Sequence, residues 1–83
     1  NRESGDGRYD IQLKPTQKGL PGILIELKAE KNCSDEKLKK LSETALQQIN
    51  DKKYETELTT AGVRTIYKYG VAFSGKKVEV AVG

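Results

Sequence analysis

The chain contains no histidine and no methionine, and Cys33 is its single cysteine. Without histidine, the sequence excludes Ser-His-Asp catalysis and any zinc site with histidine ligands. A single cysteine excludes an intrachain disulfide and a cysteine zinc cluster. A catalytic thiolate would need a neighbouring base, and no histidine is present to serve as one. We therefore interpret Cys33 as a surface or partly buried thiol near the start of a helix.

Long apolar runs are also lacking. No stretch approaches the ~20 residues that a membrane-spanning helix requires, and no signal peptide is visible. A cytoplasmic location is the resulting expectation. Because the chain does not begin with methionine, we expect it to be a piece of a longer protein.

The length predicts one small domain over residues 1–83. A chain of this size buries only about 60% of the surface that its unfolded form exposes, so its core is modest. The hydrophobic share of 35% and the charged share of 33% are typical of a soluble folded domain. Fifteen Lys and Arg against twelve Asp and Glu give a net charge of +3, which is compatible with a polyanionic partner without requiring one.

Residues 8–28 predict two antiparallel strands joined by a turn-forming loop. Polarity alternates along both ends of this segment, and Pro15, Gly19 and Pro21 interrupt its middle. If the hairpin is symmetric about Lys18, Asp10 lies directly opposite Glu26. Directly opposed residues of antiparallel strands hold their Cβ atoms about 4.5–5.5 Å apart. The hairpin is thus expected to bring two carboxylates together.

Two carboxylates at this separation repel each other unless a proton or a cation lies between them. A hard divalent ion such as Mg2+ suits such a site, because all of its ligands are oxygen atoms. Lys28 follows Glu26 by two residues and projects from the same face, where its ammonium would hold a water molecule or a phosphate oxygen. The alternative is a solvated face on which Lys28 pairs with a carboxylate, because Asp, Glu and Lys are common and short motifs match by chance.

A helix is predicted after this hairpin. Ser34 is a good N-cap, and Asp35 and Glu36 lie in the first turn, where the helix dipole favours negative charge. The core-facing stripe consists of Leu38, Leu41, Ser42, Ala45, Leu46 and Ile49. We expect this helix to pack on the sheet.

Gln48 shares the core-facing sector of this helix. A buried amide without hydrogen-bond partners costs about 1–3 kcal/mol, so Gln48 needs specific partners there. One interpretation is a functional amide, and the other is a boundary residue that bonds to backbone or water.

The remaining elements complete a mixed sheet. Residues 50–60 predict a helix end, a turn or a second short helix, which Gly62 ends. Residues 64–74 and 77–82 predict two strands joined by a turn at Gly75. A right-handed crossover would make 64–74 parallel to 22–28, with 77–82 antiparallel at an edge. The polar stretch 1–7 predicts a loop.

An aspartate followed on the next strand by Glu-x-Lys resembles the PD-(D/E)xK nuclease motif, with Tyr9 in place of its proline. Further runs resemble the PD-(D/E)xK domain at the C-terminal end of a family of bacterial AAA-ATPase-like proteins. They are NRESGDGRYDI (1–11), LKP (13–15), GILIELK (22–28), ALQQI (45–49) and FSGK (73–76). The resemblance covers nearly the whole chain.

This resemblance implies an α+β (mixed α/β) fold of the restriction-endonuclease type, with one main amphipathic helix. The fold would be truncated on its N-terminal side, because the family carries an additional helix and strand before the first run. The implied activity is hydrolysis of DNA with Mg2+ or Mn2+. Asp10 and Glu26 would bind the metal with the backbone carbonyl of Leu27, Lys28 would position water or stabilise charge on phosphorus, and Gln48 would orient one of these groups.

Further residues have less specific implied roles. Glu3 would add a third acidic ligand, with a solvated loop carboxylate as the alternative. Arg2, Arg8 and Lys52 would contact phosphates, and Lys52 would equally complement a helix dipole. Tyr54 resembles a family tyrosine near the site, and we interpret it as a packing residue.

The partners implied are DNA and an ATPase domain in the same parent chain. Two alternatives stay open. The chain would be a non-catalytic nucleic-acid-binding or protein-docking module with a degenerate nuclease fold, or a fragment that functions only as a homodimer through exposed sheet edges.

Overall fold

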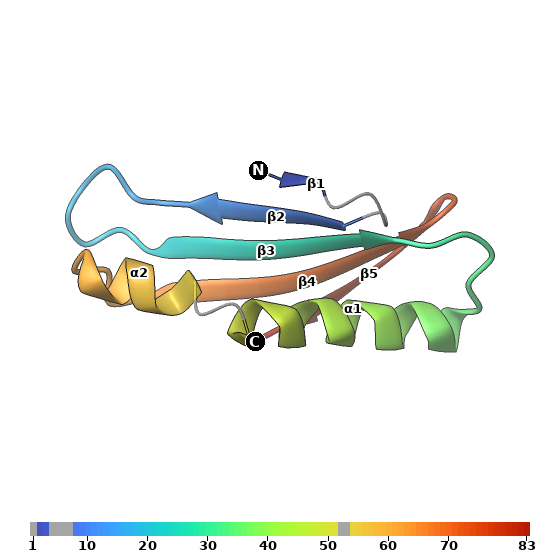
Figure 1. Cartoon of the computed structure of the whole chain (residues 1–83). Helices are drawn as coiled ribbons and strands as arrows, with labels where there is room; N and C mark the ends of the chain where they lie inside the picture. The colour runs from blue at the N-terminus through green and yellow to red at the C-terminus, as the bar shows by residue number, and fades with distance from the viewer. Residues whose placement is uncertain (1, 4–7, 52–53) are drawn as a thin grey trace.

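The computed structural model describes the backbone of residues 2–3, 8–51 and 54–83, and the side chains of residues 10–49 and 54–83. A five-stranded mixed sheet carries two helices (Figure 1). The strands are β1 (Arg2–Glu3), β2 (Arg8–Leu13), β3 (Gly22–Ala29), β4 (Ile66–Ser74) and β5 (Lys77–Val82), and the helices are α1 (Asp35–Asp51) and α2 (Tyr54–Thr60). The expected α+β fold is confirmed, and it is consistent with the restriction-endonuclease type.

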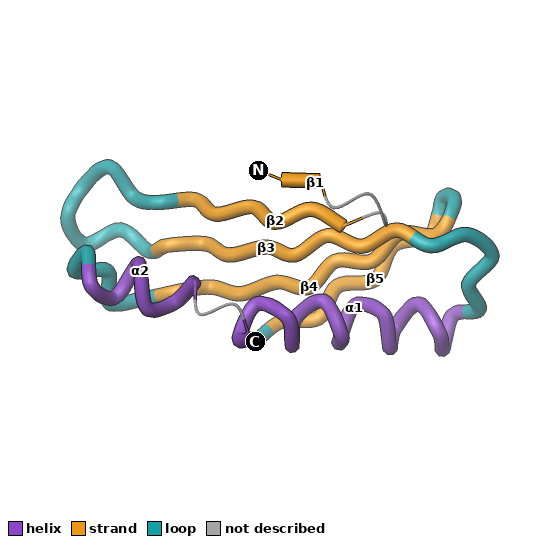
Figure 2. Tube along the Cα trace, viewed as in Figure 1, coloured by secondary structure: helices purple, strands orange, loops and turns teal. Residues whose placement is uncertain are grey.

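The strands lie in the sheet in the order in which they occur in the chain. β2 pairs antiparallel to β3, β3 pairs parallel to β4, and β4 pairs antiparallel to β5. The parallel pair follows from the crossover through α1 and α2, as the sequence predicts. Both helices lie on the same side of the sheet, as Figure 2 shows.

One sequence prediction needs correction. Residues 1–7 were expected to form a loop, but Arg2–Glu3 is a short strand that pairs with Tyr9 and Asp10 of β2, and residues 1 and 4–7 lie outside the described residues. The one main helix expected is α1, and 54–60 forms a second short helix, which was one of the alternatives for this segment. β1 has no sequence pattern of its own, since only its pairing with β2 makes it a strand.

The described core lies between the sheet and the helices. One cluster consists of Leu24, Ile49 and Leu58, and the other of Cys33, Leu38 and Ala72. The amide of Lys37 donates a hydrogen bond to Ser34 Oγ at 3.2 Å, which confirms the predicted N-cap. Cys33 precedes α1, as expected, but it is 4% exposed and so more deeply buried than predicted.

Helix α1 lies very close to the sheet at Gly70 of β4. A Cβ atom at Gly70 would lie 2.2 Å from the carbonyl oxygen of Ser42 and 2.4 Å from the amide nitrogen of Leu46, both on the backbone of α1. Real Cβ atoms do not approach backbone atoms this closely. The missing side chain of Gly70 is therefore what allows α1 to rest on β4.

The other side of the sheet, here called the open face, is covered by neither helix. Its strand residues alternate with those that face α1, and those with described side chains carry no charge. Large side chains stay exposed on it, namely Leu13, Tyr67, Phe73, Val78, Val80 and Val82. None of the helices in the described part of the chain is long and apolar enough to span a membrane.

Candidate functional site

The register of the β2–β3 hairpin pairs Asp10 directly with Glu26. This pairing confirms the one expected from a hairpin symmetric about Lys18. Directly opposed residues of an antiparallel pair project from the same side of the sheet, with Cβ atoms about 4.5–5.5 Å apart. The two carboxylates therefore share the side that carries α1 and α2.

Glu26 lies in the middle of the sheet and is fully buried, with 0% of its surface exposed. Its register partner on β4 is Gly70, over which α1 approaches most closely. Transferring a carboxylate from water to the protein interior is costly unless charges or hydrogen bonds compensate for the lost hydration. A buried glutamate opposite a half-buried Asp10 is therefore a candidate for function rather than a product of core packing.

Tyr54, interpreted from the sequence as a packing residue, is a direct neighbour of the carboxylate pair. Its hydroxyl donates a hydrogen bond to Asp10 Oδ2 at 2.8 Å. The ring also packs against the Leu24–Ile49–Leu58 cluster, so the expected packing role is confirmed but incomplete. Asp10 and Tyr54 are 44 residues apart in the chain, and only the resemblance to a family tyrosine pointed to this contact.

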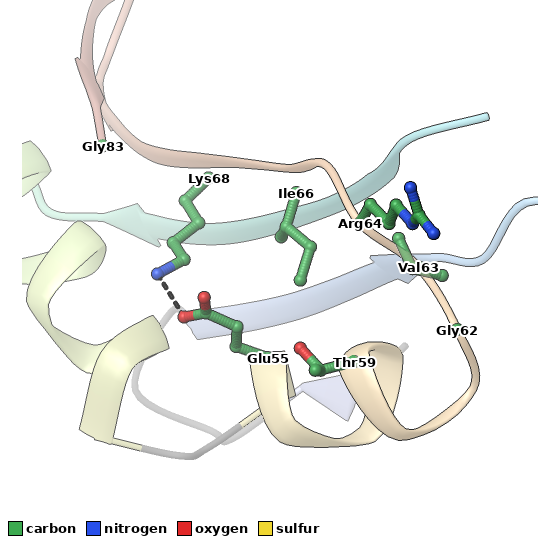
Figure 3. A pocket seen from close by; sticks show the side chains of 8 residues that line it. All are labelled: Glu55, Thr59, Gly62, Val63, Arg64, Ile66, Lys68 and Gly83. Carbon is green, nitrogen blue, oxygen red and sulfur yellow. Dashed lines mark hydrogen bonds and ion pairs between the residues drawn. The ribbon is translucent and has the colours of Figure 1, made fainter. Parts of the chain in front are cut away.

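Two further contacts hold α2 against the sheet. Lys68 of β4 forms an ion pair with Glu55 at 2.5 Å (Figure 3). Gln12 Nε2 of β2 donates a hydrogen bond to Glu57 Oε2 of α2 at 3.4 Å. Leu58 is the buried side chain of this short helix. These contacts fix the position from which Tyr54 reaches Asp10.

Gln48 of α1 is half-buried, and its Oε1 atom is buried without a hydrogen-bond partner. An unsatisfied buried amide oxygen costs about 1–3 kcal/mol, so a water, an ion or a substrate group is expected to satisfy it. Asp10 Oδ1 and Glu26 Oε1 are also buried. Three oxygen atoms of the predicted site residues are thus shielded from bulk water.

Lys28 lies two residues beyond Glu26 on the same side of β3, opposite Arg8 of β2. It is half-buried, and no hydrogen bond or ion pair joins it to another residue in the described part of the chain. The alternative in which Lys28 neutralises a carboxylate of this face therefore has no support among the described contacts. Its ammonium group remains available to a ligand.

Four predicted site groups cannot be placed. The side chains of Arg2, Glu3 and Arg8 lie outside what the structure describes, as does the whole of Lys52. Within the described ranges, no group of three or more His, Cys, Asp or Glu side chains gathers.

The residues that are present nevertheless fit Mg2+. Asp10, Glu26, the Gln48 amide oxygen and the Leu27 carbonyl offer only oxygen donors. Mg2+ is commonly held by one or two carboxylates and completes its coordination with water. The donor set therefore suits a hard divalent cation, which Asp10 and Glu26 would hold.

Replacing Tyr54 by phenylalanine tests the contact with Asp10. We expect the free energy of unfolding to fall by about 1.5–3 kcal/mol, because a hydrogen bond to a carboxylate is lost while the ring packing is kept. Urea unfolding measures this difference. Tyr67→Phe is the matched control, since Tyr67 is 46% exposed on the open face; its expected change is within about 0.5 kcal/mol. Equal effects of the two substitutions would contradict a stabilising Tyr54–Asp10 bond.

In a comparison with protein families, residues 1–82 match the family described as the PD-(D/E)XK nuclease superfamily. Comparisons with curated proteins and with solved structures found no match.

Proposed function

The chain belongs to the PD-(D/E)XK nuclease superfamily, and from this premise we propose that it is a metal-dependent nuclease that hydrolyses phosphodiester bonds of DNA. One observation supports the proposal above all: the strand register pairs Asp10 with Glu26 on the side of the sheet that carries the helices. These are the aspartate and the glutamate of the Asp…Glu-x-Lys motif.

Asp10 and Glu26 hold Mg2+ or Mn2+ in this proposal, assisted by the Leu27 backbone carbonyl and by Glu3. A divalent cation bound there would polarise a phosphate oxygen and lower the pKa of a bound water. The burial of Glu26 supports this role, because a dry environment strengthens the attraction between carboxylate and cation. The Tyr54 hydroxyl holds one oxygen of Asp10 in place and so fixes how that carboxylate presents its other oxygen.

Lys28 and Gln48 act on the substrate in this proposal. Lys28 stands beside the carboxylate pair and positions the attacking water or stabilises the negative charge that develops on the phosphoryl oxygens. The Gln48 amide orients one of these groups, and its buried acceptor atom supports a role that needs a bound partner. Arg2, Arg8 and Lys52 contact neighbouring phosphates.

A metal titration tests the proposal. Thermal unfolding is recorded at increasing concentrations of Mg2+ or Mn2+, and cleavage of a labelled DNA is measured at the same concentrations. A cation at about 100 times its Kd stabilises the folded state by about 2.7 kcal/mol, which raises the Tm of a domain of this size by about 10–20 °C. DNA cleavage should rise over the same concentrations.

The control is the same titration with K+ at matched ionic strength, which should give neither effect. DNA binding without a metal-linked rise in Tm and without cleavage would overturn the proposal and indicate a non-catalytic binding module.

A further inference from the structure

A second candidate site lies at the end of the sheet from which β3 begins. Here the loop between β2 and β3 meets the segment between α2 and β4, and together they enclose a hollow of about 740 Å³. The amide of Gly22 donates a hydrogen bond to the carbonyl of Thr65 at 2.9 Å, which ties the two segments together. This hollow, here called the loop pocket, is distinct from the Asp10–Glu26 pair.

One wall of the loop pocket is held by the C-terminal end of α2. Gly62 has a φ of +94°, and its amide donates to the Thr59 carbonyl at 3.0 Å. The amide of Val63 donates to the Leu58 carbonyl at 3.0 Å, which completes a Schellman motif. Val63 also packs against the buried Leu58. The wall that carries Arg64 is therefore fixed by backbone hydrogen bonds.

The charged groups of the loop pocket are all positive. Lys14 and Lys18 line it from the β2–β3 loop and Arg64 lines it from the opposite wall, while no acidic residue lines it. None of these three cations forms an ion pair with another residue in the described ranges. Figure 3 shows Arg64 extending away from the Lys68–Glu55 pair. Three uncompensated cations around one hollow favour a polyanion.

Most of the uncharged side chains that line the pocket are apolar, and they indicate which class of polyanion would fit. Leu20 is 48% exposed at the pocket, and Leu58 and Val63 contribute the wall behind it. A single-stranded nucleic acid offers both phosphates for the cations and flat base surfaces for the apolar groups. Inorganic phosphate would use only the cations.

The loop pocket lies on the same side of the sheet as the carboxylate pair. Leu58 of α2, which lies on the side that carries the helices, lines the pocket, and Lys14 directly follows the last residue of β2. Four residues of strand span about 13 Å. A strand stacked as in duplex DNA advances about 3.4 Å along the axis per phosphate, so at most about four nucleotides cover this distance.

We propose that the loop pocket is a binding subsite for the backbone of the substrate strand, at most about four nucleotides away from the phosphate at Asp10 and Glu26. The proposal rests on the proposed nuclease function for what happens at the carboxylates, but it makes its own claim about binding. Lys14, Lys18 and Arg64 contact strand phosphates, and Leu20 contacts a base.

The test is metal-free binding of fluorescent single-stranded oligonucleotides to the whole chain, followed by anisotropy over a range of salt concentrations. The pocket variant carries Lys14→Gln, Lys18→Gln and Arg64→Gln. For single strands, each lost phosphate contact lowers the slope of log Kd against log salt by about 0.7, so the expected fall is about 2. The Kd at low salt should rise by about 10-fold or more.

The matched control variant carries Lys39→Gln, Lys40→Gln and Lys76→Gln, three exposed lysines outside the loop pocket. Its Kd should change by less than about 3-fold, because these side chains make no specific phosphate contact in the proposal. The bases are the second variable. An abasic oligonucleotide of the same length, which keeps the phosphates but offers Leu20 no base surface, should bind the parent chain more weakly.

The outcomes separate the two proposals. Equal weakening by the pocket and control variants, or an unchanged salt slope in the pocket variant, overturns the loop pocket even if the chain cleaves DNA. Equal affinity of the parent chain for the abasic strand overturns it as well, since that would indicate a site for phosphate alone. If the pocket variant alone loses affinity for single strands while the parent chain shows no metal-dependent cleavage, the nuclease proposal fails and the loop pocket stands.

Discussion

Substituting Asp10 by asparagine, or Glu26 by glutamine, is expected to lower metal-dependent DNA cleavage by about 10³-fold or more. Each change replaces a charged oxygen ligand by a neutral amide of almost the same size. Glutamine is chosen at position 26 because Glu26 is fully buried, and truncation to alanine would also create a cavity. Any loss of cleavage can then be assigned to the missing charge and not to altered packing.

Initial cleavage rates with saturating Mg2+ measure this effect, and melting curves with and without the metal show whether cation binding is lost with it. Glu79→Gln is the matched control, since Glu79 is also a strand glutamate; it is half-buried and lies on β5, opposite Ala72. It should cleave at the rate of the parent chain. Parent-level cleavage by either site variant would rule out the assigned metal ligands.

Gly70→Ala is expected to have the largest effect on stability, a loss of about 3 kcal/mol in the free energy of unfolding, at the upper end of the costs of overpacking. The added methyl group would lie 2.2 Å from the Ser42 carbonyl oxygen and 2.4 Å from the Leu46 amide nitrogen. These are helix backbone atoms, so no side-chain rotation relieves the clash. Helix α1 must move away from β4 over the row that contains Glu26.

Urea unfolding gives the change in free energy, and the corresponding fall in Tm is about 10–20 °C for a domain of this size. Gly22→Ala is the graded control. Its Cβ would lie 2.9 Å from Leu58 Cδ1, the end of a flexible side chain, so a cost of about 1 kcal/mol is expected. If Gly70→Ala costs no more than Gly22→Ala, the close approach of α1 to Gly70 is refuted.

The strand pairing was accessible from the sequence because strand parity and hairpin symmetry are local properties. Counting outward from Lys18 was sufficient to place Asp10 opposite Glu26, and the register bears this out. The helix that begins after Ser34 has both a cap and an apolar stripe, so its position was equally accessible. The parallel pairing of β3 and β4 followed from the rule on crossover connections.

The Tyr54–Asp10 bond was not accessible in the same way. Helix α2 has only seven residues and a single buried side chain, Leu58, so no periodic stripe indicates which way it faces. Its orientation depends on contacts with distant strands, such as the Lys68–Glu55 pair.

The role of Gly70 could not be predicted from the sequence for a related reason. In a strand pattern, glycine signals only weak propensity or a close backbone approach, and the sequence does not say which element approaches. The loop pocket likewise requires two loops to meet, and nothing local in either loop reveals this.

Under the loop-pocket proposal, rising salt concentration has opposite effects on association at the open face and on phosphate binding at the loop pocket. Contacts with phosphates weaken as salt concentration rises, whereas sulfate and similar salts strengthen the association of apolar surfaces. Because no charge interrupts the described part of the open face, nothing there offsets the second effect. Under the loop-pocket proposal, a sulfate wash that removes nucleic acid from this protein therefore also promotes self-association through the exposed valine- and tyrosine-lined open face, whereas a chloride wash releases the nucleic acid with less self-association.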